Sequence, residues 1–399
     1  MSAGLISIGP AGGLAGWWQR SAPITPASFY RPELDVLRFL AFFLVFVRHT
    51  GASIAGEMYE AGGWQAVLAD LSMPGSYGVD VFFLLSAYLI TDLLMREKER
   101  SGRLDIKAFY IRRILRIWPL YFFFLVSMIV LAQFTPVQFP PDAILPMLLF
   151  YGNWYLMTNP FFSPAGILWS ISLEEQFYAG APWAVRYLTR RRLVIAAIVL
   201  LVVASLARLV IFSVPTIANK AAWFCSFTRL DPIAVGIIVC LLLRGRVPSF
   251  AMASRALLIA AGAVTLYVAA VPLNGVADDH TLLEGMIAYP LGTLGALLIF
   301  LGFLGARLDW RPLVYLGQIS FGLYVYHLLA LNIAKEGLVH FTGECPFLWR
   351  GAIALPITLL LAMGSYAFLE RPFLRLKERF VRAPGGAAGD GLAAARGPT

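Results

Sequence analysis

Long apolar blocks recur along the whole chain, and the short segments between them carry most of the charge. An α-helix needs about 20 apolar residues to cross a bilayer core, so blocks of this length predict membrane-spanning helices. We therefore expect an all-α polytopic membrane protein with about ten transmembrane helices. The expected spans lie near 34–53, 78–95, 117–134, 167–185, 193–213, 222–243, 256–273, 284–305, 312–334 and 350–370.

An eleventh apolar segment, near 143–157, is shorter and is interrupted by Pro146 and Gly152. If the N-terminus is cytoplasmic and this segment does not span, most of the 32 lysines and arginines fall on the cytoplasmic side. If it spans, the arginines between 186 and 192 fall outside, against the positive-inside rule. We therefore predict that 143–157 is re-entrant or interfacial and that both termini are cytoplasmic.

Composition agrees with a membrane domain. The chain is 59% hydrophobic and 14% charged, whereas soluble proteins carry about 25% charged residues. The net charge of +9 is explained by cytoplasmic loops, so no nucleic-acid partner is expected. The three cysteines form no disulfide framework and no metal-binding pattern. We expect a cytoplasmic N-terminal segment at 1–30, a transmembrane domain at 31–380 and a disordered cytoplasmic tail, rich in Gly, Ala and Pro, at 381–399.

Two ionisable residues on the first expected span suggest chemistry within the membrane. Arg38 and His49 are eleven residues apart, so in an α-helix they share a face and are separated along the axis by about 16 Å. Each alone could extend to the nearest headgroups. The pair on one face favours function, because buried charges are costly and usually functional. Asp35 precedes Arg38 by three residues and could neutralise it.

Two further spans carry carboxylates. Asp80, near the outer end of the second span, could orient an imidazole or simply favour the start of its helix. The motif LWSISLEEQFY places Glu174 one turn from Tyr178. A buried glutamate suits general acid or base catalysis, although a structural hydrogen-bond network between helices is an equal alternative.

Other polar residues fall into two groups. The motif FYIRRILRIWPLY carries Arg112, Arg113 and Arg116, and guanidinium groups bind phosphate in a bidentate way. Ordinary positive-inside anchoring is the simpler alternative. The motif LGQISFGLYVYH places Tyr324 and His327 on one helical stripe, which we expect to face an outer cavity.

Seven motifs in order carry a resemblance to a known family. The chain resembles the acyltransferase family 3 membrane proteins, which include O-antigen and other polysaccharide O-acetyltransferases. The resemblance covers roughly residues 30–375. The matching motifs are RPELDVLRFLAFFLVFVRH, GVDVFFLLSAYLIT, FYIRRILRIWPLY, LWSISLEEQFY, RLDPIAVG, LGQISFGLYVYH and ERPF.

The resemblance implies transfer of an acyl group, expected to be acetyl, from acyl-coenzyme A to a hydroxyl of a cell-envelope carbohydrate or glycoconjugate. It implies the bacterial inner membrane as the location. The family's essential pair corresponds to Arg38 and His49, and its cytoplasmic arginine motif to Arg113 and Arg116, which favours phosphate binding for these arginines. Membrane lipid, polysaccharide-assembly proteins or further copies of the chain are the expected partners.

Two departures from the family pattern stand out. The chain has Ser86, Ala87 and Tyr88 where the family usually has Ser-Gly-Phe, so we expect local packing to differ. No fused periplasmic esterase-like domain, as some members carry, is expected after residue 380, so acceptor recognition should differ as well.

The resulting hypothesis assigns catalytic, donor-binding and substrate-cavity roles. His49 either deprotonates the acceptor hydroxyl or carries the acyl group itself, with Asp80 or Glu174 orienting its ring.

The alternatives are a transporter or flippase of an acyl or sugar compound, and an inactive scaffold; the sequence shows no inverted repeat that would favour a transporter. The catalytic candidates are His49, Asp80 and Glu174; the donor-binding candidates are Arg38, Arg112, Arg113 and Arg116; the substrate-cavity candidates are Trp169, Ser170, Tyr178, Tyr324 and His327; no metal site is expected.

Overall fold

The computed structural model describes residues 30–52, 55–161, 163–214, 217, 219–275 and 281–381, with side chains placed through Leu376. The expectations for an N-terminal segment at 1–30 and a tail at 381–399 fall outside these residues, except at Tyr30 and Val381. Within the described residues every regular element is a helix, as the apolar blocks predict.

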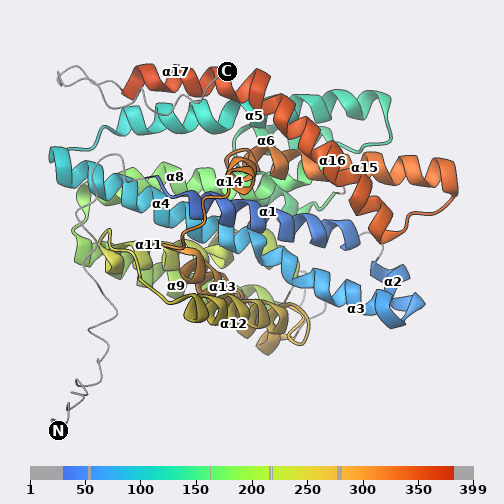
Figure 1. Cartoon of the computed structure of the whole chain (residues 1–399), viewed down its shortest axis with the longest axis horizontal. Helices are drawn as coiled ribbons and strands as arrows, with labels where there is room; N and C mark the ends of the chain where they lie inside the picture. Colours follow the sequence, from blue (N-terminus) through green and yellow to red (C-terminus); the bar gives the residue numbers. More distant parts are fainter. Residues whose placement is uncertain are drawn as a thin grey trace, which may run out of the picture.

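Ten helices form the body of the molecule, and shorter ones connect them (Figure 1). The ten are α1 (Pro32–Ala52), α4 (Gly78–Ser101), α5 (Ile106–Phe134), α8 (Trp169–Tyr187), α9 (Arg190–Ser213), α11 (Asp231–Leu243), α12 (Met252–Ala270), α13 (Leu282–Phe303), α15 (Ser320–Thr342) and α16 (Phe347–Ser365). The shorter ones are α2 (Ala55–Ala61), α3 (Gly63–Ser72), η3 (Met73–Tyr77), η4 (Pro141–Ala143), α6 (Ile144–Leu148), α7 (Gly152–Thr158), η5 (Pro164–Leu168), α10 (Ala221–Phe224), η6 (Phe227–Arg229), α14 (Arg311–Gln318), η7 (Tyr366–Glu370) and α17 (Arg371–Val381).

The expected number of ten spans is not confirmed. In the described part of the chain, six helical stretches are long and apolar enough to cross a membrane, and the number rises to eight if α1 with α2 and α14 with α15 each count as one bent span. The helix α8 carries Glu174, Glu175 and Arg186, and α11 has only 13 residues, so both fall outside this count. The coarser expectation, an all-helical membrane protein, holds.

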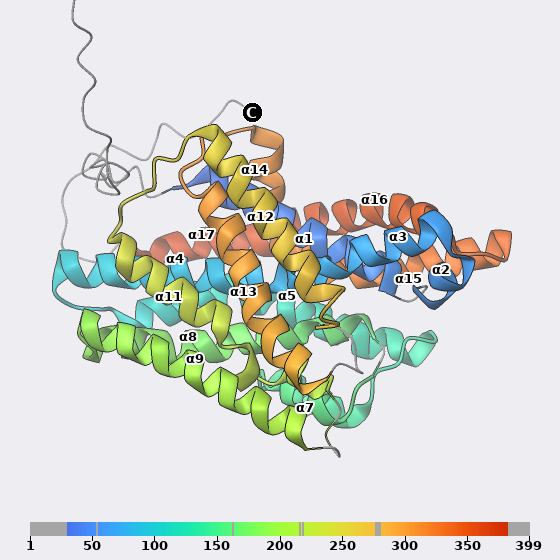
Figure 2. The same ribbon diagram turned by 90° about the horizontal axis from the view of Figure 1, so that it is seen from below.

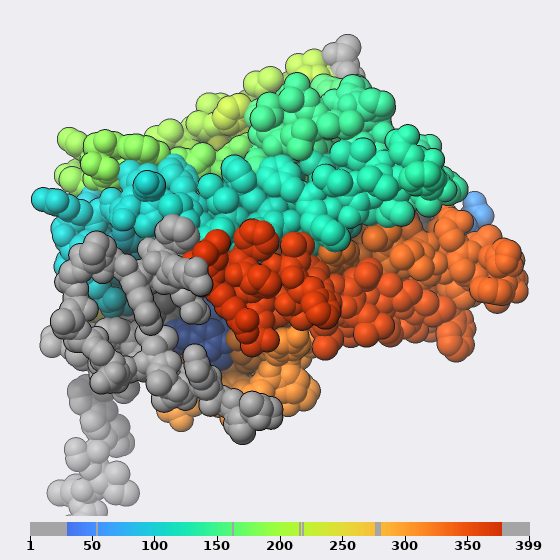
Figure 3. All heavy atoms as spheres, turned by 90° about the horizontal axis from the view of Figure 1, so that it is seen from above, coloured from blue at the N-terminus to red at the C-terminus, as the bar shows by residue number. Residues whose placement is uncertain are grey.

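The helices α1 and α4 pack against each other near the middle of the bundle (Figure 1). On one side, α12 and α13 lie together as a pair, as Figure 2 shows from a second direction. On another face, α17 lies beside α5 (Figure 3). Residues from α1, α4, α5, α8 and α15 line a common cavity.

Glycines allow the closest of these contacts. A Cβ at Gly317 of α14 would lie 1.9 Å from the carbonyl oxygen of Asp35 in α1. A Cβ at Gly236 of α11 would lie 2.4 Å from the carbonyl oxygen of Leu84 in α4. Small residues let backbones approach closely within membranes, where packing rather than water expulsion drives helix association. These two glycines fix α14 against α1 and α11 against α4.

The segment 143–157 forms two short helices, α6 and α7, broken at Phe150, whose φ is 56°. Protein side chains satisfy its backbone: the Tyr121 hydroxyl donates to the Met147 carbonyl at 2.7 Å, and Gln176 donates to the Phe150 carbonyl at 2.9 Å. Non-helical backbone is tolerated at membrane depth only where protein covers it in this way. The geometry agrees with a segment that does not span.

Candidate functional site

Two neighbouring cavities contain nine of the twelve candidate site residues. Asp80, Arg112 and His327 line neither of them, and the expectation that His327 faces a cavity is wrong because its ring is fully buried. The first, here called the arginine cavity, has a volume of about 140 Å³. It lies between α1, α4, α5, α8 and α15. Its polar lining residues are Arg38, Ser86, Arg113, Arg116, Ser170, Glu174, Tyr178, Ser320 and Tyr324.

Three guanidinium groups converge on the arginine cavity. Arg38 is held by an ion pair with Asp35, Nη1 to Oδ1 at 2.6 Å, as the spacing of three predicted. The Arg113 guanidinium lies 5.5 Å from the ring centroid of Tyr178, and its buried Nε has no hydrogen-bond partner among the described residues. Arg116, one turn further along α5, lines the same cavity. The arrangement is suited to an anionic ligand with several oxygens.

Arg112 lies apart from this group. Its Nη2 donates to Glu97 Oε2 at 3.2 Å, and it does not line the arginine cavity. The reason is helical geometry: adjacent residues point about 100° apart, so Arg112 turns away from the side shared by Arg113 and Arg116.

Glu174 also lies in the arginine cavity, where it accepts a hydrogen bond from the Ser86 hydroxyl. This contact joins α8 to α4 at the motif in which the chain departs from the usual Ser-Gly-Phe. The next residue, Ala87, packs against Gly236 of α11, since a Cβ on that glycine would lie 2.9 Å from the Ala87 Cβ. The extra methyl group at position 87 is thus directed to α11, away from the hydrogen bond of its neighbour Ser86.

The second cavity, here called the histidine cavity, has a volume of about 370 Å³. It lies at the end of α1 opposite Arg38. It is lined by Arg48, His49, Ala52, Ser76, Trp169, Asn219, Lys220, Trp223, Phe224, Gly275 and Tyr289.

His49 is paired with His327. The distance from His327 Nε2 to His49 Nδ1 is 3.1 Å. His327 Nδ1 lies 2.6 Å from the Tyr324 carbonyl oxygen, and His49 Nδ1 lies 3.0 Å from the Val45 carbonyl oxygen.

These contacts assign the tautomers of two neutral rings. A carbonyl oxygen only accepts, so His327 carries its proton on Nδ1 and presents the lone pair of Nε2 to His49. His49 then carries its proton on Nδ1, which leaves the lone pair of its own Nε2 without a proton. A histidine in this state is equipped to act as a base or a nucleophile.

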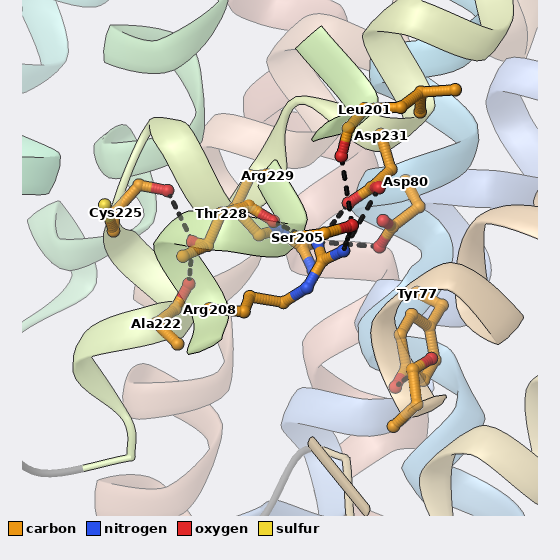
Figure 4. A network of polar contacts seen from close by, with 11 residues as sticks. Tyr77, Asp80, Leu201, Ser205, Arg208, Ala222, Cys225, Thr228, Arg229 and Asp231 are labelled. Carbon is orange, nitrogen blue, oxygen red and sulfur yellow. Dashed lines mark hydrogen bonds and ion pairs between the residues drawn. The ribbon is translucent and has the colours of Figure 1, made fainter. Parts of the chain in front are cut away.

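Asp80 and Glu174 do not orient His49, contrary to the sequence interpretation. The polar partners of His49 within the described residues are the Val45 carbonyl and His327. Asp80 instead forms a buried ion pair with Arg229, Oδ2 to Nη2 at 2.7 Å (Figure 4). Both side chains need a charged partner once they are out of water, so each satisfies the other rather than His49.

A second buried ion pair joins Arg208 of α9 to Asp231 of α11, beside the first (Figure 4). Arg229 thus pairs with the distant Asp80, and its near neighbour Asp231 pairs with Arg208. The partners come from different helices, and nothing in local spacing identifies them.

Two adjacent residues of α8 divide the cavities. Trp169 lines the histidine cavity and Ser170 the arginine cavity. The Ser170 hydroxyl lies 2.7 Å from that of Tyr324, and Tyr324 is one turn from His327. The Ser170–Tyr324 pair therefore lies at the boundary between the arginines and the histidines.

Sequence reasoning missed much of the histidine cavity. Arg48 was not among the candidate residues, but it lines the cavity, and its Nε donates to Ser76 Oγ at 3.1 Å. Its position next to His49 was the available signal. Trp223 and Tyr289 belong to no short motif, so only the fold brings them to the site.

Comparison with known proteins identifies bacterial relatives of this chain. Three bacterial relatives each match over 86% of this chain. They are the O-acetyltransferase OatA of Staphylococcus aureus, 27% identical over 367 residues and 57% of that protein; the putative peptidoglycan O-acetyltransferase YrhL of Bacillus subtilis, 28% identical over 372 residues and 55% of that protein; and the peptidoglycan O-acetyltransferase OatA of Listeria monocytogenes, 25% identical over 366 residues and 56% of that protein.

The chain spans a little over half the length of these relatives. No solved structure gives a significant match. The model of the acyltransferase 3 family, described as an acyltransferase domain, matches residues 31–367, which include both cavities. The chain therefore belongs to the acyltransferase 3 family.

Proposed function

We propose that the protein is a membrane O-acyltransferase that moves an acyl group, expected to be acetyl, from acyl-coenzyme A to a hydroxyl of a cell-envelope carbohydrate. One observation carries the proposal. A cavity with three arginines lies next to a second cavity with a base-competent histidine, and the adjacent residues Ser170 and Trp169 of α8 line one cavity each.

The arginine cavity supports the donor assignment. Its three guanidinium groups outnumber the one carboxylate that lines it, Glu174, so it favours anionic phosphates. Phe82, Leu89 and Ile90 supply apolar lining beside them. Coenzyme A combines phosphates with a long, thin arm, and this combination matches charged and apolar lining in one cavity.

His49 Nε2 would supply the chemistry by one of two routes. As a general base it takes the proton from the acceptor hydroxyl, whose oxygen attacks the thioester carbonyl as coenzyme A leaves. As a nucleophile it attacks the thioester itself, the carbon–sulfur bond breaks, and the acceptor hydroxyl later attacks the acyl-imidazole. In both routes the ester forms on the acceptor and the thiolate of coenzyme A takes up the released proton.

The acceptor is proposed from the relatives. Two of them are named as peptidoglycan O-acetyltransferases, one as putative, which favours a peptidoglycan glycan over lipopolysaccharide. We place the protein in the bacterial inner membrane with both termini cytoplasmic, because this orientation leaves most basic residues inside and puts the arginine cavity on the side of the donor.

The proposal is tested with purified protein in liposomes, acetyl-coenzyme A labelled on the acetyl group, and a soluble peptidoglycan fragment. We expect label on the glycan, and we expect His49→Ala to reduce transfer by about a hundredfold or more, because a lost general base typically costs 10²–10⁴ in rate. Equal transfer by the His49→Ala variant would contradict the mechanism. Absence of transfer together with uptake of solute would indicate a transporter instead.

Donor binding has its own test. Replacing Arg113 and Arg116 together with glutamine should raise KM for acetyl-coenzyme A while leaving KM for the acceptor unchanged. Arg112→Gln is the matched control, since Arg112 pairs with Glu97 outside the cavity, and its donor KM should stay close to wild type. Equal donor KM values in the wild type, the double variant and the Arg112→Gln variant would show that Arg113 and Arg116 only anchor the helix.

A further inference from the structure

Aromatic rings form much of the wall of the histidine cavity. Trp169, Trp223, Phe224 and Tyr289 line it together with polar residues that include Arg48, His49 and Asn219. Its volume of about 370 Å³ falls within the range of about 300–1,000 Å³ usual for small-molecule sites. The wall thus combines flat apolar faces with hydrogen-bonding groups.

Trp223 is at the centre of this aromatic group. Its ring centroid lies 6.4 Å from that of Trp169, 6.0 Å from that of Tyr289 and 5.9 Å from that of Tyr77. The side chain is only partly buried, and what remains accessible lines the cavity that holds His49.

A buried ion pair lies against the same ring. The Arg229 guanidinium carbon is 4.1 Å from the centroid of Trp223, a distance at which a cation and an aromatic face attract each other. Arg229 Nη2 donates to Asp80 at 2.7 Å, and the two side chains are 1% and 2% exposed. Figure 4 shows Arg229 and Asp80 pointing toward each other from different elements.

Arg229 combines its ion pair with Asp80 and its contact with the Trp223 ring. Its buried Nε has no hydrogen-bond partner among the described residues, a condition that normally costs free energy. The guanidinium carbon nonetheless lies over the Trp223 ring. Asp80 therefore fixes the arginine, and the arginine supports the indole.

We propose that Trp223 is a stacking platform for a pyranose ring of the acceptor, and that Arg229 and Asp80 are positioning residues that hold this platform beside His49. Sugar rings present C–H groups on their faces, which pack on the electron-rich face of an indole, and hydroxyl groups at their edges, which need polar partners. The inference deepens the proposed function and rests on it.

The first test is direct binding. Chitotetraose, a soluble chain of pyranose rings, is titrated into the purified full-length protein, and its ring protons are followed by saturation-transfer NMR. Trp223→Ala should weaken binding by about tenfold, the loss expected for one aromatic contact. Trp349→Ala, at a tryptophan that is 65% exposed at the start of α16, is the matched control and should bind as wild type.

The second test separates positioning from mere charge balance. Arg229→Lys keeps a cation for Asp80 but loses the planar group that stacks. It should raise KM for the glycan acceptor while leaving KM for acetyl-coenzyme A unchanged. The double variant Asp80→Asn with Arg229→Gln removes both charges, leaves no lone buried charge, and should show the same change in acceptor KM.

A control for folding is available in Arg255. Within the described part of the chain, this buried arginine donates to backbone carbonyls, including those of Gly302 and Leu304. Arg255→Gln should lower the melting temperature without altering acceptor KM in the folded fraction. An unchanged acceptor KM in both Arg229 variants would overturn the positioning role.

The outcomes distinguish the two proposals. If the wild-type protein transfers no acetyl group to any glycan, the proposed function fails. If it transfers acetyl, and the Trp223→Ala variant binds chitotetraose and uses the acceptor as the wild type does, only the sugar platform fails.

Discussion

At the scale of single residues, the main finding is that His49 is oriented by another histidine. The Tyr324 carbonyl accepts a hydrogen bond from His327 Nδ1, and His327 Nε2 accepts one from His49 Nδ1. Each contact therefore fixes the position of one ring proton. A carboxylate in place of His327 would stabilise a charged imidazole. A neutral histidine instead leaves His49 neutral, with one free lone pair.

We predict that His327→Phe lowers kcat by roughly 10- to 100-fold, the usual effect of losing a group that orients a functional histidine. The fully buried ring is replaced by one of similar shape, so the melting temperature and the donor KM should change little. His327→Gln keeps an acceptor for His49 and should restore part of the rate. A phenylalanine variant with the wild-type kcat would disprove the assignment.

The residues of the site could be predicted only in part. Arg38 and His49 follow from helical spacing, and Arg113, Arg116, Glu174 and Tyr178 do line one cavity. The partner of Asp80 could not be predicted, because Arg229 is 149 residues away. Ion pairs between helices depend on which helices are neighbours, and local periodicity does not contain this information.

At the scale of helices, small residues determine how α4 and α11 pack. Ala87 faces Gly236, and the Leu84 carbonyl lies directly over the same glycine. This contact holds the start of α11, and with it Arg229 and Asp231, against the part of α4 that carries Asp80.

We predict that Gly236→Ala destabilises the protein by about 1–3 kcal/mol, the usual cost of overpacking, because the new methyl group would lie 2.4 Å from a backbone oxygen that cannot move away. Thermal unfolding in detergent measures the effect. Gly364→Ala in α16 is the control, since nothing lies within 4 Å of its Cβ position. Equal melting temperatures for the two variants would refute this account of the packing.

Helices were easier to predict from the sequence than spans. Each apolar block contains one of the ten helices of the body, but 222–243 is continuous helix only from Asp231, and 312–334 is bent between α14 and α15. Hydropathy alone also does not show whether α8 crosses the membrane. Glu174 is satisfied by Ser86 on α4, so the polar side of α8 faces protein instead of lipid. A hydropathy profile cannot separate these two environments.

At the scale of the whole molecule, the two cavities lie toward opposite ends of α1, and the proposed topology assigns those ends to opposite sides of the membrane. The connection between α15 and α16 should then be external. It contains Cys345, which is partly exposed, whereas Cys225 and Cys240 are buried.

We predict that a membrane-impermeant maleimide labels Cys345 in intact cells, and that Cys345→Ser abolishes labelling. Burial raises the pKa of the Cys345 thiol, and maleimide reacts with the thiolate. Less thiolate is therefore present near neutral pH than for a free cysteine, and the labelling rate should increase between about pH 7 and about pH 9. Labelling only after the cells are permeabilised would reverse the topology.

The contact between Ser170 and Tyr324 also bears on how many coenzyme A molecules are released for each ester formed. One hydrogen bond between neutral hydroxyls contributes only about 0.5–1.5 kcal/mol, so breaking the Ser170–Tyr324 contact alone costs little free energy. In the proposed enzyme, the intact contact would help to keep water on the acceptor side from a thioester bound among the arginines. In an enzyme built this way, the number of coenzyme A molecules released should stay close to the number of esters formed.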